Sequence, residues 1–312
     1  GFLSTAGKEV LEGLGVFDSI HVVDAKWLKY KKTNPFTRWL SALSVLKAIN
    51  KEKFDILIGM RHQDRLTSLI LSLSNAKRKV GYNVGGMGFG KNSRFAVSNS
   101  QIHEVQQNLE LLKLLEPTAK PKIKLGFSVS AESEKRITDI LKKHKVKKYV
   151  VIHPVSGHPS KDWAMENYIK LASALAKQYA VFVAGAKDDN RINILVGKKI
   201  YNTAGLLGIK ELGSLIKRAE LVIGNDSAGA HIAAVFGVKS LTVFSGAARR
   251  ENWAAYSSRS YLIVKDTPCR NCQLLKCRLK VHECMQIPVE TVLKTATNIL
   301  AGKEKKKTVQ VS

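Results

Sequence analysis

Short runs of apolar residues alternate along this chain with longer segments in which apolar residues recur every three or four positions. Continuous apolar runs are typical of strands in sheets covered on both faces, and the longer segments are typical of amphipathic helices. Strands alternating with helices predict βαβ units and parallel sheets, so the expected fold class is α/β. The strands are expected at 20–24, 54–60, 149–153, 180–184, 220–224, 240–245 and 260–264. The helices are expected at 36–50, 64–74, 103–115, 131–145, 164–177, 211–218, 230–236 and 288–301.

The alternation is interrupted near residues 117–147, where a polar, Pro-bearing stretch (EPTAKPKIKLGFSVSAE) precedes a basic segment (KKHKVKK). A chain of 312 residues is too long for one ordinary core and suits two domains. We therefore predict two Rossmann-like, doubly wound domains, at residues 1–125 and 148–287, with a cleft between them. A helix at 288–302 and a basic, disordered tail at 303–312 complete the expected organisation.

The segment GNDSAGAHIAAVFG, at residues 224–237, places polar residues directly after an apolar run and before a helix. Ligands bind at the carboxyl ends of parallel strands, and the N-terminus of a helix there attracts phosphate. The candidates for holding an anion are Ser227, Ala228, Gly229 and His231, and Asp226 is a candidate for capping the helix or holding a hydroxyl. Asp-Ser pairs also cap ordinary helices, and spacing alone does not separate the two interpretations.

Two further loops follow expected strands. In HPVSGHPSKDW (153–163), Ser156 and Gly157 offer hydroxyl and N–H groups and Lys161 offers a point charge for phosphate. The alternative is an ordinary loop with a solvated lysine. In AGAKDDN (184–190), Asp188 or Asp189 is a candidate for ribose hydroxyls, although the two equally suit an N-cap pair.

In the first half, Arg61, His62 and Arg65 follow the expected strand 54–60 and are candidates for a basic wall that binds an anionic acceptor. The glycine-rich stretch GGMGFG (85–90) does not have the G-x-G-x-x-G spacing of a dinucleotide fingerprint, and no strand–helix turn surrounds it. It is expected to be a mobile loop.

Charge sets this chain apart: 51 Lys and Arg against 25 Asp and Glu give a formal net charge of +26. Such a balance attracts nucleic acid, anionic membranes or phosphorylated small molecules, and it also suits a protein from a basic proteome. Aromatic residues make up 7% and no recognition motif appears, so specific nucleic-acid binding is not favoured. The sequence contains no P-loop and no Asp-x-Asp pair.

All cysteines lie in one segment, as Cys269, Cys272, Cys277 and Cys284. This clustering leaves open a structural metal, either Zn²⁺ or an iron–sulfur cluster, as well as reduced thiols or disulfides. No apolar run approaches the ~18 residues of a membrane span, and residues 1–20 lack the order of a signal peptide. A cytoplasmic protein is expected.

Four stretches, taken together and in order, resemble glycosyltransferase family 9, the ADP-heptose:lipopolysaccharide heptosyltransferases. They are FDILIGMRHQDRLTSLILSLSNAKRKVGY (54–82), HEVQQNLELLKLL (103–115), HPVSGHPSKDW (153–163) and LVIGNDSAGAHIAAVFGVKSLTVFSG (221–246). The cysteine segment is similar to an insert of heptosyltransferase II-like members. The resemblance implies the GT-B fold, with the donor nucleotide on the second domain and the C-terminal helix packed back on the first.

The resemblance also implies inverting transfer of heptose from ADP-heptose to the phosphorylated inner core of lipopolysaccharide, without an essential catalytic metal. The donor would be bound by Ser156, Gly157, Lys161, Asp188, Asp226, Ser227, Ala228, Gly229 and His231, and the acceptor by Arg61, His62 and Arg65. Lys161 would stabilise the leaving ADP. Peripheral attachment to the anionic inner face of the inner membrane would follow from the charge.

Two departures from the family pattern matter. Ala228 stands where the family has Gly. The family's general-base Asp follows a first strand expected upstream of residue 1, so the first strand is expected to be missing and these 312 residues to be a fragment or a poor catalyst. The alternatives are a transferase for another nucleotide sugar, in O-antigen or capsule synthesis, and a non-catalytic protein that binds nucleotide sugars.

Overall fold

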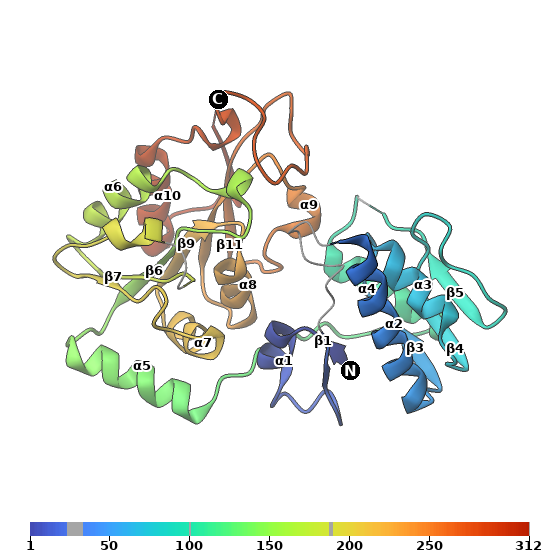
Figure 1. Cartoon of the computed structure of the whole chain (residues 1–312). Coiled ribbons are helices and arrows are strands. Elements are labelled where there is room, and N and C mark those ends of the chain that lie inside the picture. The colour runs from blue at the N-terminus through green and yellow to red at the C-terminus, as the bar shows by residue number, and fades with distance from the viewer. Residues whose placement is uncertain (24–33, 100, 187–189, 312) are drawn as a thin grey trace. The chain divides into compact units, whose positions relative to one another are not determined.

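The computed structural model describes residues 1–23, 34–99, 101–186 and 190–311 (Figure 1). They form two compact units: unit 1 takes residues 1–8 and 15–124, and unit 2 takes residues 9–14 and the chain from 125 onward. Unit 2 starts earlier than the residue 148 expected from the sequence. The reason is that helix α5 (Ala131–Lys143) packs on the sheet of unit 2 through the fully buried Ile137.

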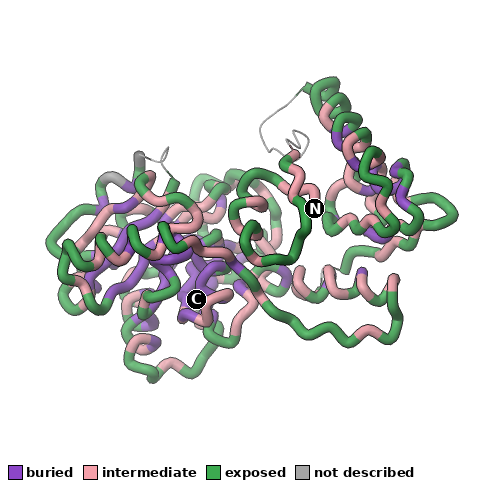
Figure 2. The backbone as a smooth tube through the Cα atoms, turned by 90° about the horizontal axis from the view of Figure 1, so that it is seen from below, coloured by how far each residue is buried: buried purple, intermediate pink, exposed green. Residues whose placement is uncertain are grey.

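Unit 2 is built on a seven-stranded parallel sheet in the order β12-β11-β10-β9-β6-β7-β8. The five strands predicted in this half of the chain are present, each within one residue of its expected ends. Their apolar residues are buried on both faces of the sheet, and Figure 2 draws buried residues in purple. The strands are β6 (Tyr149–His153), β7 (Ala180–Val183), β8 (Ile200–Asn202), β9 (Leu221–Asn225), β10 (Ser240–Phe244), β11 (Ser260–Lys265) and β12 (Thr308–Val311).

Helices cover both faces of this sheet, as the doubly wound prediction requires (Figure 1). Helices α6 and α10 enclose one core, and helices α5, α7 and α8 enclose the other. The helical elements of this unit after α5 are η2 (Pro159–Lys161), α6 (Met165–Leu175), η3 (Asn190–Ile194), α7 (Ile209–Lys217), α8 (Ala228–Val235), α9 (Arg250–Trp253), η4 (Glu283–Met285) and α10 (Val289–Leu300).

The end of the chain packs in unit 2. Val292, Ala296 and Ile299 of helix α10 lie in the core of unit 2, beside α6 and β9, and the packing of this helix on the first domain stays a prediction. The tail from residue 303 is not disordered throughout, because Thr308–Val311 pair in parallel with β11 as strand β12. Alternating residues Val309 and Val311 pack against the same core, which gives this strand an apolar side despite the basic residues before it.

Unit 1 contains a three-stranded parallel sheet, β3-β4-β5, and a separate parallel pair, β1-β2. Phe2–Leu3 form the short strand β1 before the first helix and pair with β2, and the expectation that the family's first strand lies upstream of residue 1 stays a prediction. The elements of this unit are β1 (Phe2–Leu3), α1 (Thr5–Leu11), β2 (His21–Val22), α2 (Pro35–Glu52), β3 (Ile56–Ile58), α3 (Arg65–Leu73), β4 (Arg78–Tyr82), β5 (Ser93–Ala96) and α4 (Glu104–Leu115). The last three residues of α1, at positions 9–11, are part of unit 2.

Among the described residues, no helix is both long enough and apolar enough to cross a bilayer.

Candidate functional site

The candidate site lies where the strand order of unit 2 reverses, between β6 and β9. These strands are neighbours in the sheet, with His153 opposite Gly224 at their carboxyl ends. Loops leaving such a pair diverge to opposite faces of the sheet, so a crevice for ligands forms there in open α/β sheets. The loop after β6 carries Lys161, and the turn after β9 carries Asp226 and leads into α8.

Two glycines allow the close approach of β6, β9 and α8. A Cβ atom on Gly224 would lie 2.2 Å from the backbone oxygen of His153, and a Cβ on Gly229 would lie 3.1 Å from the His153 Cβ. Contacts this short leave no room for a side chain at the first position and little at the second. The glycines therefore set how near the N-terminus of α8 lies to the end of β6.

Asp226 is the charged centre of the site. Its Oδ2 accepts a hydrogen bond from Lys161 Nζ at 2.6 Å, and its Oδ1 lies 3.8 Å from His231 Nε2. Only 5% of the Asp226 side chain is exposed, against 45% for His231. Burial by itself raises the pKa of Asp226, but the hydrogen bond from His231 and the charge of Lys161 outweigh it and hold that pKa below its ordinary value. A carboxylate thus anchors two donors at the crevice.

The capping interpretation of Asp226 and Ser227 is not supported. Ser227 occupies the N-cap position of α8, but its side chain makes no capping hydrogen bond. Its Oγ instead lies 2.9 Å from His153 Nδ1 and shares a hydrogen bond with it. The first turn of α8 therefore keeps its positive end without a side-chain cap, next to Lys161, and this is an arrangement that attracts an anion.

The loop after β6 is shaped by Asp162. Asp162 Oδ1 accepts hydrogen bonds from the backbone N–H and the hydroxyl of Ser156, both at 2.8 Å, and Oδ2 accepts one from Arg191 Nη1 at 3.0 Å. The Ser156 hydroxyl is thus engaged within its own loop. Gly157, at the exposed tip, has no atom within 4 Å of the position of a Cβ. Asp188, predicted to bind the donor, lies outside the described residues.

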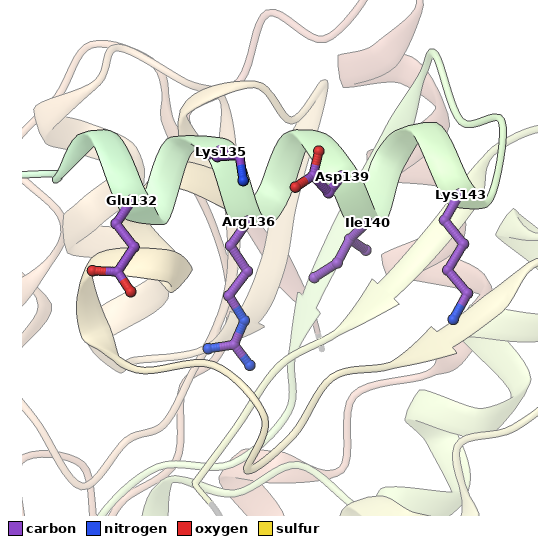
Figure 3. Close-up of a pocket in the computed structure, with 6 residues that line it drawn as sticks. All are labelled: Glu132, Lys135, Arg136, Asp139, Ile140 and Lys143. Carbon is purple, nitrogen blue, oxygen red and sulfur yellow. The ribbon is translucent and has the colours of Figure 1, made fainter.

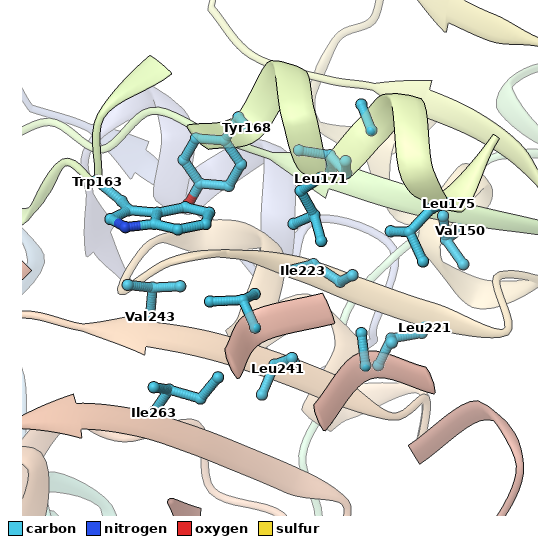
Figure 4. Packing of buried hydrophobic residues seen from close by; sticks show 14 of the residues in the cluster. Val150, Trp163, Tyr168, Leu171, Leu175, Leu221, Ile223, Leu241, Val243 and Ile263 are labelled. Carbon is cyan, nitrogen blue, oxygen red and sulfur yellow. The ribbon is translucent and has the colours of Figure 1, made fainter. Parts of the chain in front are cut away.

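Asn225 joins the two loops, and sequence reasoning did not assign it a role. Its Oδ1 accepts hydrogen bonds from Trp163 N at 3.1 Å and Tyr168 Oη at 2.8 Å. Its Nδ2 donates to the Pro154 oxygen and to Asp162 Oδ1 at 3.3 Å. Trp163 and Tyr168 pack edge to face over the buried strands (Figure 4). The signal that the sequence offers is an asparagine at the very end of an expected apolar strand.

His153 is a second residue that the sequence did not single out. Burial lowers its pKa from 6.5 to about 4, so the folded protein holds it as neutral imidazole near neutral pH. The unfolded chain binds this proton below about pH 6.5, and the folded chain binds it only near pH 4. Stability from this group is therefore complete above about pH 6.5 and is lost as the pH falls towards 4 and below.

Between about pH 6.5 and pH 4, we expect the free energy of unfolding to fall by about 3 kcal/mol less in His153→Gln than in the wild type. The measurement is urea unfolding at half-unit steps from pH 7.5 to pH 4. A variant whose unfolding free energy falls as steeply as that of the wild type would show that His153 titrates normally in the folded protein.

Unit 1 holds the three predicted acceptor residues, and they differ in exposure. Arg61 is exposed after β3, and Arg65, the first residue of α3, lies over Gly85, whose added Cβ would be 2.5 Å from its Nε. His62 is buried: its Nδ1 lies 2.9 Å from Glu104 Oε1, and its ring packs edge-on to Tyr82. His62 is therefore part of the packing between β4 and α4, and its place in a basic wall for the acceptor stays a prediction.

The structural metal expected as one option at the cysteine segment stays a prediction. Within the part of the chain that the structure describes, no three His, Cys, Asp or Glu side chains are grouped closely enough to hold a metal ion. Cys284 is buried beside Ser245, Cys269 lies 3.5 Å from Thr267 Oγ1, and all four are free thiols. The segment does buttress the site loop, because Ser160 N donates to the Leu275 oxygen at 3.0 Å.

A hollow along α5 is lined by residues other than those of the crevice. It is lined by Glu132, Lys135, Arg136, Asp139, Ile140 and Lys143 (Figure 3). Arg136 points towards the loop before α7, where it bonds the Leu206 oxygen at 2.7 Å and pairs with Glu211 at 3.0 Å. These contacts fasten α5 to α7.

The chain is similar to known heptosyltransferases. "Lipopolysaccharide core heptosyltransferase OpsX" of Haemophilus influenzae is 26% identical over 224 residues, which are 67% of this chain. The match spans 62% of that relative, so this chain covers less than two thirds of its length.

Solved structures share the fold. A family 9 glycosyl transferase from Veillonella parvula matches with a TM-score of 0.76 at 18% identity, covering 96% of this chain and 87% of that one. Escherichia coli heptosyltransferase WaaC with ADP-2-deoxy-2-fluoro heptose matches with a TM-score of 0.66 at 14% identity, covering 95% and 88%. These likenesses confirm the expected GT-B class.

The family model of "Glycosyltransferase family 9 (heptosyltransferase)" matches residues 42–282. This span includes the β6–β9 crevice, Lys161, Asp226 and three of the four cysteines. The chain belongs to glycosyltransferase family 9.

Proposed function

We propose that this protein is an inverting glycosyltransferase that moves heptose from ADP-heptose to the phosphorylated inner core of lipopolysaccharide. The observation that carries the proposal is the group of Lys161, Asp226 and His231 beside the uncapped N-terminus of α8, in a chain of this family. The names of its relatives supply the sugar and the acceptor, since one acts on the lipopolysaccharide core and one was solved with an ADP-heptose analogue.

The donor diphosphate would lie against the first turn of α8, where the helix dipole and backbone N–H groups favour negative charge. Lys161, which is 21% exposed, faces the same point and is held there by Asp226. When the bond between the sugar and the diphosphate breaks, negative charge grows on the leaving ADP. A fixed ammonium group in a largely buried crevice stabilises that charge more than water does.

We also place the protein at the inner face of the inner membrane, because a chain of net charge +26 is attracted to anionic lipid and its proposed acceptor is lipid-anchored. No residue of this chain is assigned as the general base that activates the acceptor hydroxyl. The residues of the crevice therefore account for donor binding and for stabilisation of the leaving ADP, and not for activation of the acceptor.

The direct test is calorimetric titration of the full chain with ADP and ADP-heptose, with UDP- and GDP-sugars as a matched panel. We expect binding of the two adenine compounds and at least tenfold weaker binding of the others. Preference for another nucleotide would overturn the choice of donor. Binding of ADP-heptose with no transfer to a heptose-free lipopolysaccharide acceptor would favour the non-catalytic alternative.

Replacement of Lys161 separates binding from leaving-group stabilisation. We expect Lys161→Met to lower kcat by about 10²–10³-fold, because a charge that acts mainly in the transition state is lost. The control is Lys170→Met on the exposed side of α6, which should leave kcat unchanged. Steady-state transfer assays with both substrates varied measure the effect. A rise in KM with unchanged kcat would show that Lys161 only binds the ground state.

A further inference from the structure

Helix α2 exposes an apolar face that the fold of unit 1 does not use. Phe36, Trp39, Leu40 and Leu43 are 67%, 50%, 50% and 55% exposed. Their positions, at i, i+3, i+4 and i+7, place all four on one side of the helix over its first two turns. The helix start is fixed by Pro35 at its first position and by Asn34, whose side chain accepts a hydrogen bond from Phe36 N at 2.9 Å.

The core contact of α2 is made by a different face. Ala42, Val45 and Ile49 are buried against α3 and neighbouring residues of unit 1. Their spacing of three and four defines a stripe on the side of the helix away from the exposed four. Core packing therefore explains one apolar face of α2 and leaves the other without a structural reason.

The charges of α2 indicate what covers the second face. The exposed stripe continues, one turn after Leu43, into the exposed residues Lys47 and Lys51. Glu52 is the single acidic residue in this helix. Large apolar side chains beside basic ones, with a tryptophan among them, are typical of helices that lie in the interface of an anionic bilayer. A second copy of the chain would instead bring together two basic faces of a protein with net charge +26.

We propose that the first half of α2 lies in the plane of an anionic phospholipid membrane, with Phe36, Trp39, Leu40 and Leu43 inserted at the boundary between headgroups and acyl chains. Lys47 and Lys51 then face lipid phosphates, and their apolar stems lie along the surface. An interfacial position suits a helix that is not apolar enough to span a bilayer, as holds for every helix among the described residues. This assignment rests on the membrane attachment in the proposed function and names the element responsible.

Co-sedimentation of the full chain with vesicles tests the assignment. The vesicles are pure phosphatidylcholine, or phosphatidylcholine with 30% phosphatidylglycerol, and contain no lipopolysaccharide. We expect binding to the anionic vesicles that weakens as salt is raised. The double variant Trp39→Gln/Leu43→Gln should bind at least tenfold more weakly, and so should Lys47→Glu/Lys51→Glu.

Matched variants elsewhere separate this face from general properties of the chain. Val196→Gln/Leu206→Gln replaces two apolar side chains that are 67% and 62% exposed in unit 2. Lys170→Glu/Lys177→Glu makes the same change in net charge at two exposed positions on or just after α6. Both control variants should bind vesicles within threefold of the wild type.

Tryptophan emission gives a second readout. Trp39 should move from water to an apolar environment, so vesicles should shift emission to shorter wavelength in the wild type. Trp39→Phe should abolish that shift and keep binding within threefold, because the apolar face is retained.

Each outcome bears on a different statement. Wild-type binding to the α2 variants would overturn α2 as the contact, and absence of binding to anionic vesicles would overturn the attachment itself. Loss of self-association in the Trp39→Gln/Leu43→Gln variant during sedimentation velocity would identify a second copy as the occupant and overturn the proposal. ADP binding by the same variants, measured separately, reports on the crevice of unit 2 and so on the transferase proposal.

Discussion

Replacing Asp226 with alanine is expected to lower kcat/KM for transfer from ADP-heptose by about 10³-fold. The carboxylate holds Lys161 Nζ at 2.6 Å and lies 3.8 Å from His231 Nε2, so its loss frees both donors from their positions at the crevice. Preorganised donors stabilise a transition state because they need not be reoriented during the reaction. Loss of the carboxylate should therefore affect kcat more than the affinity for ADP.

The control for Asp226→Ala is Asp266→Ala, which removes the partner of Arg250 and Arg270 at a more exposed site, 31% exposed. It should keep kcat/KM within about twofold, since exposed ion pairs contribute little. Asp226→Asn keeps the size of the side chain and removes its charge, and it should behave like Asp226→Ala. Turnover by Asp226→Asn within threefold of the wild type would mean that the carboxylate has only a structural role.

The same carboxylate links the site to acid stability. Because the pKa of Asp226 is held below its ordinary value, the folded protein binds this proton less readily than the unfolded chain does. The stabilisation it provides is therefore present above its unfolded pKa, about 3.9, and is lost as the pH falls through the lower folded value. The fall in stability caused by His153 begins at higher pH, so the two groups can be distinguished.

The central strands of unit 2 could be predicted from the sequence because each is rich in apolar residues that are buried on both faces of the sheet. β4 (RKVGY), β8 (IYN) and β12 (TVQV) could not. Their own residues do not distinguish a strand from a loop, and only pairing with distant segments makes them strands. The basic residues before β12 favoured a disordered tail, whereas the edge of β11 and an apolar stripe on β12 favour pairing.

Part of the candidate site could also be predicted. Lys161 and Asp226 each follow an expected strand, and strands adjacent at a reversal of order bring such loops together. The order of the strands cannot be read from local sequence patterns, however. The bond between Ser227 and His153 and the four hydrogen bonds of Asn225 depend on the order of the strands in unit 2. The burial of His62 against Glu104 depends in the same way on tertiary packing within unit 1.

Gly224→Ala is expected to lower the free energy of unfolding by about 3–5 kcal/mol. The added Cβ would lie 2.2 Å from the backbone oxygen of His153, so β6 and β9 would have to separate in the middle of the sheet. A backbone atom cannot turn aside as the end of a side chain can. Urea unfolding monitored by tryptophan emission measures the loss.

Two other glycines of the site provide a graded series. Gly229→Ala brings a Cβ to 3.1 Å from the His153 Cβ, and a shift of the imidazole by a few tenths of an ångström relieves this contact. Its expected cost is about 1–2 kcal/mol. Gly157→Ala meets no atom within 4 Å and stands outside the left-handed region of φ, so its stability should change by less than about 0.5 kcal/mol.

The order of the three variants in free energy of unfolding tests the geometry of the crevice independently of any ligand. If Gly224→Ala were as stable as Gly157→Ala, the close approach of β6 and β9 would be wrong, and with it the position of α8 beside Lys161. Gly157→Ala also tests the donor assignment cleanly, because its fold should be unchanged. A rise in KM for ADP-heptose in that variant would place the donor against the tip of the β6 loop, whereas an unchanged KM would remove Gly157 from the binding surface.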